Sequence, residues 1–372
     1  MKIETVTVDI LRHDLAHPMS DAQVNIAART TVLVRICTSE GLEGVGEAGA
    51  FGGAEYTVKA IIESQLSPLL IGEDPKLVEH LWEKMYRETV QLGRRGAVIA
   101  AISGVDIALW DLLGKTYGIP VFLLLGGNTV RLPAYASGGF YMEGKGLTEL
   151  NAEFDGYRHA GYRAGKMKIA GADIVEDIAR VQAVREALGP EASLMIDANN
   201  MYRPNEAVRL AAAVESFDIF WFEEPVRTDD LVGAAYVRSR VSMPVAGYET
   251  ETSRWGFKAL IDGGAVDIVQ ADPIWAGGIT ECRRIAAYAS ACNLPIAPHN
   301  FASAVSGFAA LHLLASVPDA LYFEMDQNPN PLRTEIVSNW PVIDADGFVV
   351  VPEGPGLGMD IDEDAIDRLR VG

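Results

Sequence analysis

The sequence predicts an α/β fold in which a capping domain precedes a (β/α)8 barrel of the TIM type. Ionisable side chains end short apolar runs at intervals of 29, 26, 26, 23, 27 and 25 residues. One strand, loop and helix together need about that length, so the series indicates parallel strands that aim their side chains at one end of a closed sheet. The 372 residues suffice for a barrel of about 200–250 residues and a smaller domain. The strand-end residues are Lys168, Asp197, Glu223, Glu249, Asp272, His299 and Glu324.

The capping domain is predicted to be α+β and to span residues 1–127. Residues 1–45 have the pattern of strands, most clearly in the alternating, β-branched run 29–36. Residues 55–118 have a helical pattern, and the stretch 97–115 is apolar on nearly every side. A glycine pair marks the boundary with the next domain.

The barrel is predicted to span residues 128–327. A candidate first strand at 134–136 precedes a helix at 146–160, and an amphipathic helix at 174–187 follows the Lys166 strand. Further helices are expected near 205–215, 229–240, 254–262, 279–292 and 303–316. These elements make either a complete (β/α)8 barrel or its (β/α)7β variant. Residues 328–372 are too few for a core of their own, so we expect them to pack back on the capping domain.

The net charge limits the kinds of molecule that the protein is expected to bind. The chain has 31 Lys and Arg against 51 Asp and Glu, a formal net charge of −20. This charge disfavours non-specific binding to nucleic acid or to an anionic membrane, although a small anionic substrate remains compatible with it. There is no apolar run of about 18 residues, no signal-peptide pattern, and no CxxC spacing among the three cysteines. A cytoplasmic location is therefore expected.

Three acids at the ends of consecutive strands predict a metal site. Asp197, Glu223 and Glu249 would lie side by side at the carboxyl end of the barrel. Oxygen ligands with room for water and substrate suit Mg²⁺, with Mn²⁺ as an alternative, whereas Zn²⁺ more often recruits Cys or His. Each acid alone could instead cap the helix that follows it. Repetition at three equivalent positions favours the metal.

Two further pairs are candidates for proton transfer. Lys166 and Lys168 lie two residues apart on a strand and so point the same way, and we expect each ammonium to lower the pKa of the other. The alternative is a pair of surface lysines on an edge strand. Asp272 and His299 end neighbouring strands, where the carboxylate would fix the imidazole tautomer. A cation between two such bases suggests removal of the proton beside a substrate carboxylate, through an enediolate.

These motifs resemble the enolase superfamily and, within it, the mandelate racemase subgroup, the mandelate racemase/muconate lactonizing enzyme family. The resemblance covers essentially the whole chain. The matching motifs are Ser103–Asp111, Lys166-x-Lys168, Asp197-Ala198-Asn199, Trp221–Pro225, the Glu249 strand, Asp272, His299 and the terminal Gly-Pro-Gly-Leu-Gly segment.

The resemblance implies a role for each residue. Lys168 would be one acid/base with Lys166 as its helper, and His299 paired with Asp272 would be the other. Protonated Glu324 would donate a hydrogen bond to the substrate carboxylate. Other roles implied are Mg²⁺ binding by Asp197, Glu223 and Glu249, and a position for Asn199 inside the site. Glu224 is not expected to be a ligand, because the next residue on a strand faces the other way. Relatives usually form homo-oligomers, from dimers to octamers.

We expect the residues that select the substrate to lie outside the series of strand ends. Tyr248 replaces a small residue beside Glu249, and Glu251 adds a second acid nearby, an alternative metal ligand. Loops near 14–30 and 47–56 would supply a lid, with Phe51, Gly52 and Gly53 as candidates. Arg94 and Arg95 would reach a distal carboxylate of the substrate, and the alternative is that they face solvent. The same alternative applies to His13 and His17, whose loop would reach the barrel mouth.

Dehydration of an acid sugar, an aldonate or aldarate, to a 2-keto-3-deoxy acid is the predicted reaction, since this is the subgroup's most frequent chemistry. A racemase, an epimerase or a cycloisomerase on a related hydroxy acid or lactone would use the same pair of bases. The chain could also be a binder without catalysis, because fold does not imply function. The complete set of bases argues against that alternative.

Overall fold

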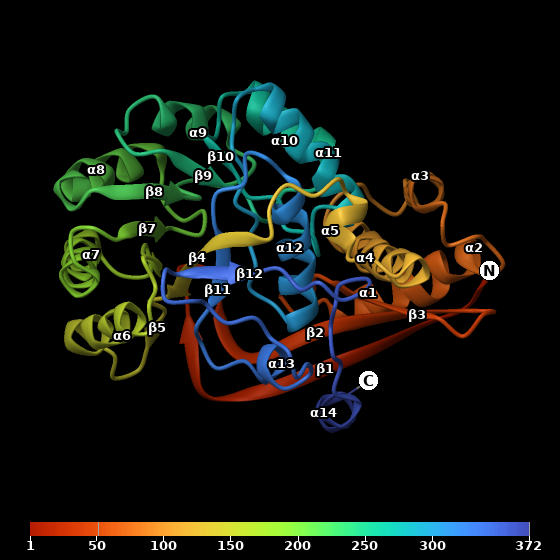
Figure 1. Cartoon of the computed structure of the whole chain (residues 1–372). Coiled ribbons are helices and arrows are strands. Elements are labelled where there is room, and N and C mark those ends of the chain that lie inside the picture. Colours follow the sequence, from red (N-terminus) through yellow and green to blue (C-terminus); the bar gives the residue numbers. More distant parts are fainter. Residues whose placement is uncertain (51, 372) are drawn as a thin grey trace.

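Parallel strands arranged in a ring form the barrel, in the left and central parts of Figure 1. The computed structural model describes residues 1–50 and 52–371. Neighbouring strands follow the order β10-β9-β8-β7-β6-β4-β11, and bridges from Val269 to Ile296 and from Ile296 to Ala320 close the ring. The segment around Ile296 therefore takes the remaining strand position. The strands are β4 (Arg131–Gly138), β6 (Ala164–Lys168), β7 (Ser193–Asp197), β8 (Ile219–Glu223), β9 (Val245–Gly247), β10 (Ile268–Val269) and β11 (Phe323–Asp326).

Helices follow seven of these strand positions within the described part of the chain and cover the outside of the barrel (Figure 1). They are α6 (Leu147–His159), α7 (Ile174–Leu188), α8 (Pro204–Val214), α9 (Leu231–Arg238), α10 (Ser253–Asp262), α11 (Gly278–Ala291) and α12 (Ala304–Ser316). Strand β11 leads instead into the short helix α13 (Pro331–Thr334). The barrel is thus the (β/α)7β variant, one of the two predicted forms.

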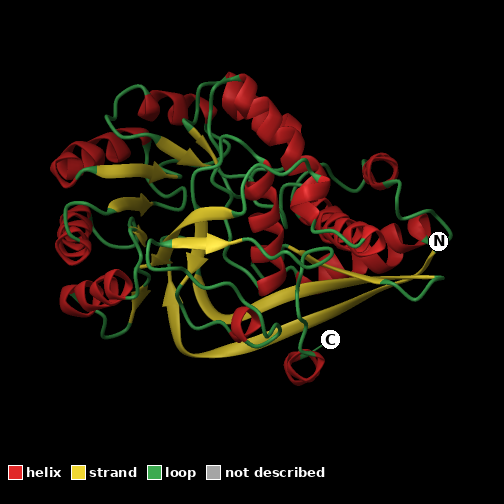
Figure 2. Cartoon of the chain, viewed as in Figure 1, coloured by secondary structure: helices red, strands yellow, loops and turns green. Residues whose placement is uncertain are grey.

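The N-terminal region is an antiparallel sheet packed against helices. Strands β1 (Ile3–Ser20) and β2 (Asn25–Thr38) form a long hairpin, and β3 (Glu43–Ala48) pairs with β2. Figure 2 shows this hairpin running from the N-terminal helices to the barrel. The predicted loop at 14–30 is therefore mostly strand, and only its tip is a turn. The helices are α1 (Glu55–Ile61), a π-helical turn (Ile62–Leu66), α2 (Ser67–Leu70), α3 (Val78–Thr89), α4 (Ala97–Tyr117) and α5 (Val121–Leu124).

Helix α4 is the core helix of the N-terminal region. It is long and apolar enough to cross a membrane, yet 89% of its most apolar stretch is buried inside the protein. Strand β3 packs directly on it, since a Cβ added at Gly46 would lie 2.1 Å from the carbonyl oxygen of Gly104. Any larger residue at Gly46 would push the sheet away from the helix.

The C-terminal segment contacts both parts of the molecule. Strand β12 (Phe348–Val350) pairs antiparallel with β4 of the barrel. Helix α14 (Glu363–Leu369) contacts β1, and the Val371 amide donates to the Ile10 carbonyl.

A layer of side chains fills the barrel beneath its mouth. It consists of Tyr135, Ala164, Met195, Trp221, Ala246, Ile268 and Ala297, one from each of seven strand positions. Side chains two residues apart on a strand point the same way, so Asp197 and Glu223 lie directly above Met195 and Trp221. This apolar floor removes water from below the ionisable groups.

Candidate active site

The predicted strand-end residues converge at the carboxyl end of the barrel, joined by ion pairs. Lys168 Nζ lies 2.5 Å from Asp197 Oδ2. Lys166 Nζ lies 2.5 Å from Glu223 Oε1 and 3.0 Å from Glu324 Oε1. These five side chains are all buried, so their charges are screened by protein groups rather than by water.

The two lysines differ from the prediction in their proton affinity. Burial, the largest single cause, would lower the pKa of Lys168, and so would repulsion from Lys166. The combined attraction to carboxylates, Asp197 first and then Glu249, outweighs these effects, and the net pKa is raised. Burial would likewise lower the pKa of Lys166, but the combined attraction to nearby groups, Glu223 and Glu324 above all, raises it. The expectation that each ammonium lowers the other's pKa considered the lysines alone. The carboxylates on the neighbouring strands contribute more.

Three acids fit a hard divalent cation in donor type. Asp197 and Glu223 lie in register on β7 and β8. Burial raises the pKa of Glu223 to about 7 and also raises the pKa of Glu249, and repulsion from Asp197 adds to both shifts. A divalent cation would relieve this repulsion. As placed, each acid faces a cationic side chain, and no three His, Cys, Asp or Glu side chains among the described residues surround a metal position.

Glu223 is held by two neutral donors as well as by Lys166. Trp221 Nε1 and Gln270 Nε2 donate to its Oε2 atom at 2.9 and 2.8 Å. Trp221 stands below it on β8, and Gln270 follows β10. Because both neutral donors use Oε2, Oε1 is the oxygen that faces a cationic group, here the Lys166 ammonium.

The second proton-transfer pair forms as predicted in geometry. His299 Nδ1 lies 2.7 Å from Asp272 Oδ2, and its Nε2 lies 3.2 Å from Glu249 Oε2. Burial would lower the pKa of His299, but Glu249 and the hydrogen bond to Asp272 raise it to about 10. Lys168 and His299 thus stand at the two ends of the carboxylate row, one beside Asp197 and the other beside Glu249.

The pKa of Glu324 is shifted downward, the direction opposite to the one that would favour the protonated carboxyl implied by the resemblance. Burial raises the pKa of Glu324, but the combined effect of its charged neighbours, led by Lys166 and His299, outweighs burial, and the net pKa falls to about 2. Its Oε2 accepts the Asn300 amide at 3.0 Å. In this arrangement Glu324 is an ionised acceptor rather than a hydrogen-bond donor.

Glu224 lies in the cavity, contrary to the strand-alternation argument. Strand β8 ends at Glu223, and Glu224 has φ +43°, so the alternation of sides does not extend to it. Its Oε1 accepts the Glu249 amide at 2.9 Å and its Oε2 accepts from Asn200 Nδ2 at 2.5 Å. Glu224 therefore orients the backbone of Glu249.

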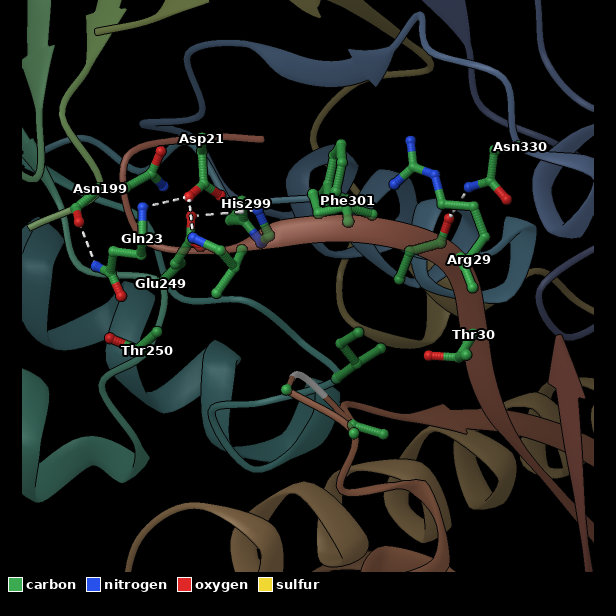
Figure 3. Close-up of a pocket in the computed structure, with 18 of the residues that line it drawn as sticks. Asp21, Gln23, Arg29, Thr30, Asn199, Glu249, Thr250, His299, Phe301 and Asn330 are labelled. Carbon is green, nitrogen blue, oxygen red and sulfur yellow. Dashed lines mark hydrogen bonds and ion pairs between the residues drawn. The ribbon is translucent and has the colours of Figure 1, made fainter. Parts of the chain in front are cut away.

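A cavity of about 710 Å³ opens above these groups and is roofed by the tip of the β1–β2 hairpin. Figure 3 shows Asp21 and Gln23 of this tip close to Asn199, Glu249 and His299. Asp21 Oδ1 accepts the Gln23 and Val24 amides, and Gln23 Nε2 donates to the Asn199 carbonyl. Sequence reasoning singled out neither Asp21 nor Gln23. An Asp that starts a turn was the signal present, and it is common in any hairpin.

The predicted substrate contacts divide between the cavity and positions outside it. Asn199 lines the cavity, and its buried Oδ1 has no hydrogen-bond partner among the described residues. Arg94 is exposed and is not a lining residue. Tyr248 is the first residue after β9 and is fully buried in the core between barrel and helices. Gly52 and Gly53 line the cavity, and Phe51 lies outside the described residues.

Glu251 and three other candidates are also placed away from the acids. The Glu251 carboxylate accepts the Thr252 amide and pairs with Arg95 at 3.4 Å, so it is directed toward the N-terminal helices. His13 lies on β1, and His17 lines a separate shallow cavity beside the hairpin.

Comparisons with known proteins match both parts of this chain. Residues 2–126 match the mandelate racemase/muconate lactonizing enzyme N-terminal domain, and residues 149–365 match the enolase C-terminal domain-like family. Arabinonate dehydratase of Saccharolobus solfataricus is 40% identical over 91% of this chain and 90% of its own. D-galactarolactone cycloisomerase of Agrobacterium fabrum is 38% identical over 100% and 99%.

Two solved structures carry ligands. A racemase from Streptomyces coelicolor with bound magnesium has a TM-score of 0.91 and 33% identity, covering 99% of this chain and 100% of its own. A Bordetella bronchiseptica protein complexed with 2-oxoglutarate/phosphate has a TM-score of 0.92 and 33% identity, covering 100% and 98%.

A (β/α)7β barrel with ionisable strand ends, roofed by an N-terminal sheet domain, defines an enzyme of the enolase superfamily. Within that superfamily, the chain belongs to the mandelate racemase/muconate lactonizing enzyme family.

Proposed function

We propose that this enzyme dehydrates an acid sugar to a 2-keto-3-deoxy acid, with Mg²⁺ held by Asp197, Glu223 and Glu249. One observation carries the proposal: Lys168 and His299, two groups able to transfer protons, stand at opposite ends of that carboxylate row. Similar enzymes named as arabinonate, L-talarate/galactarate and D-xylonate dehydratases support the substrate class.

The reaction requires one group that removes a proton from the substrate and one that gives a proton to the leaving group. One base takes the proton from the carbon beside the substrate carboxylate, which forms an enediolate. When bound, Mg²⁺ supplies positive charge where the negative charge of the enediolate develops.

We assign Lys168 as the base and His299 as the acid. Lys168 would act as a base once a cation held by Asp197 offsets the negative charge that raises the pKa of the lysine here. His299 has a pKa of about 10 and a partner in Asp272, so it can donate a proton to the departing β-hydroxyl group. The carbon–oxygen bond breaks, water leaves, and the resulting enol rearranges to the 2-keto acid. Lys166 and ionised Glu324 hold each other next to the base and set its surroundings.

The test is a screen of aldonates and aldarates with Mg²⁺, which follows 2-keto acid formation by semicarbazide absorbance and product mass. Product lighter than substrate by one water is the expected result. Exchange of the α-proton in deuterium oxide with inverted configuration, and no keto acid, would replace the dehydratase with a racemase or epimerase. No exchange with any acid would leave a binder without catalysis.

Cycloisomerisation is the second candidate. It is favoured by the 38% identity over the whole chain to a D-galactarolactone cycloisomerase. In that reaction the leaving oxygen belongs to the substrate's own ring, so the product has the mass of the substrate. The same mass measurement on lactones and anhydro sugar acids therefore separates the two reactions.

A further inference from the structure

Asp177 of helix α7 is a buried carboxylate that joins three separate segments. Its oxygens accept the Tyr141 hydroxyl at 2.6 Å, the Tyr202 hydroxyl at 2.9 Å and the Ala170 amide at 2.8 Å. None of these residues belongs to the proton-transfer groups or to the carboxylate row. The cluster therefore has a structural purpose that the proposed reaction leaves unassigned.

One side of the cluster holds the end of strand β6. Ala170 lies two residues after Lys168 and has φ +67°, a strained backbone conformation for a residue with a side chain. Asp177 binds the Ala170 amide, and the Tyr141 hydroxyl accepts the Gly171 amide at 3.1 Å. Arg180 stacks on the Tyr141 ring at 3.9 Å and donates to the Lys168 carbonyl at 3.4 Å. The turn that ends the Lys168 strand is thus fixed by Tyr141 and its partners.

The other side of the cluster holds the hairpin tip. Tyr141 and Met142 form the short strand β5 (Tyr141–Met142), which pairs with Ser20 and Met19 at the end of β1. Asp21, the next residue of the hairpin, lines the cavity.

The residue before Tyr141 also reaches the base. The Phe140 ring lies 5.2 Å from Lys168 Nζ and stacks on Phe301 at 5.3 Å. One short segment, 139–142, therefore touches both the roof of the cavity and the group that we assign as its base.

We propose that Tyr141 is a positioning residue that, through its hydroxyl bond to Asp177, holds the hairpin tip and the Lys168 strand in one fixed arrangement. Loss of the hydroxyl would leave Asp177 Oδ1 and the Gly171 amide without their partners. The tip would then be retained mainly by two β5 pairs and by Gln23, and it should open more often.

Tyr202 offers a matched control. Its hydroxyl donates to the same carboxylate, but Tyr202 belongs to the loop after β7 and not to the segment that pairs with the hairpin. That loop also carries Asn199, whose carbonyl oxygen accepts a hydrogen bond from the Gln23 side chain. Its backbone is held separately, by bonds from the Asn199 amide to Asp197 and from the Asn200 amide to the Glu224 carbonyl.

The experiment compares Tyr141→Phe with Tyr202→Phe. Hydrogen–deuterium exchange of residues 19–25 is measured without substrate, and kcat and KM are measured on the sugar acid found in the screen. Tyr141→Phe should speed exchange of the tip about tenfold, the factor expected for one lost hydrogen bond, and should lower kcat. Tyr202→Phe should change both by less than about twofold.

Equal exchange in both variants, or an unchanged tip in Tyr141→Phe, would overturn the proposal. The expected fall in kcat rests on the proposed function, whereas the expected change in hydrogen–deuterium exchange needs no turnover. If no sugar acid reacts, the reaction assignment fails and the exchange result still decides the role of Tyr141.

Discussion

The barrel mouth and the hairpin tip face each other across one cavity, yet they are built in opposite ways. Lys166, Asp197 and Glu223 are at most 1% exposed and each is held by ion pairs to neighbouring strands. At the tip, Gln23, Val24 and Asn25 are exposed, and a few hydrogen bonds hold the turn. The ionisable strand ends are thus fixed by buried ion pairs, whereas the tip is held by a few hydrogen bonds at an exposed turn, and a segment held in this way opens more readily.

The largest expected effect is at the rigid side. His299→Asn removes the group that donates and accepts protons beside Glu249, so kcat should fall by about 10³-fold or more. Mg²⁺ binding, measured by titration calorimetry, should stay close to that of the parent, because the three acids are unchanged. Loss of Mg²⁺ binding in this variant would contradict the separation of the dyad from the carboxylate row.

Stability should depend on pH through a buried histidine of the barrel. His312 of α12 accepts the Phe122 amide at 3.2 Å and contacts the Leu357 carbonyl at 3.0 Å. Burial lowers its pKa from 6.5 to about 4. The unfolded chain therefore binds the proton first, and stability is lost as the pH falls from about 6.5 to 4, by about 3 kcal/mol in total.

Urea unfolding of the parent and of His312→Gln, at several pH values, measures this contribution. The variant should be less stable at pH 8, because the flexible glutamine side chain does not hold an acceptor at the position of the ring Nδ1 that binds the Phe122 amide. Its stability curve should also be flatter than that of the parent between pH 6.5 and 4. Parallel curves would show that His312 does not titrate as its burial requires.

The rigid side is also the part that the sequence predicts well. The apolar run before Asp197 or Glu223 ends one strand, and the βα repeat then puts all strand ends at one rim. Glu224 was misplaced because a positive φ interrupts the alternation right after β8. The proton affinity of Lys168 was misjudged because it depends on carboxylates from other strands, whose distances the sequence does not contain.

The hairpin side was much less predictable. Gln23 and Asn199 are 176 residues apart in the chain, and no local pattern indicates that they meet. Tyr141 and Asp177 are likewise joined only by the packing of α7 on the barrel. Exposed polar residues at a turn satisfy the local preferences of any hairpin, so their function becomes visible only when the opposite wall is in place.

A smaller effect is expected for Gln270, which holds Glu223, one of the proposed metal ligands. Gln270→Leu removes one of the two neutral donors to Glu223 Oε2 without a large change in volume. Mg²⁺ affinity should fall about tenfold, as is usual when a partner of a metal ligand is lost. Gln327→Leu is the control, because Gln327 donates to Tyr162 and Met325 instead. Equal losses of affinity in both variants would assign the effect to general destabilisation.

The smallest effect should come from the tip, and it should appear in KM. Asp21→Ala removes the acceptor for the Gln23 and Val24 amides, so the turn loosens and KM should rise about fivefold. Asp21→Asn keeps an oxygen at that position and should stay within about twofold of the parent. Because the tip carries neither assigned base, kcat should change little in both variants. A fall in kcat comparable to that of His299→Asn would mean that Asp21 takes part in proton transfer, and the division between a rigid catalytic wall and an adaptable roof would no longer hold.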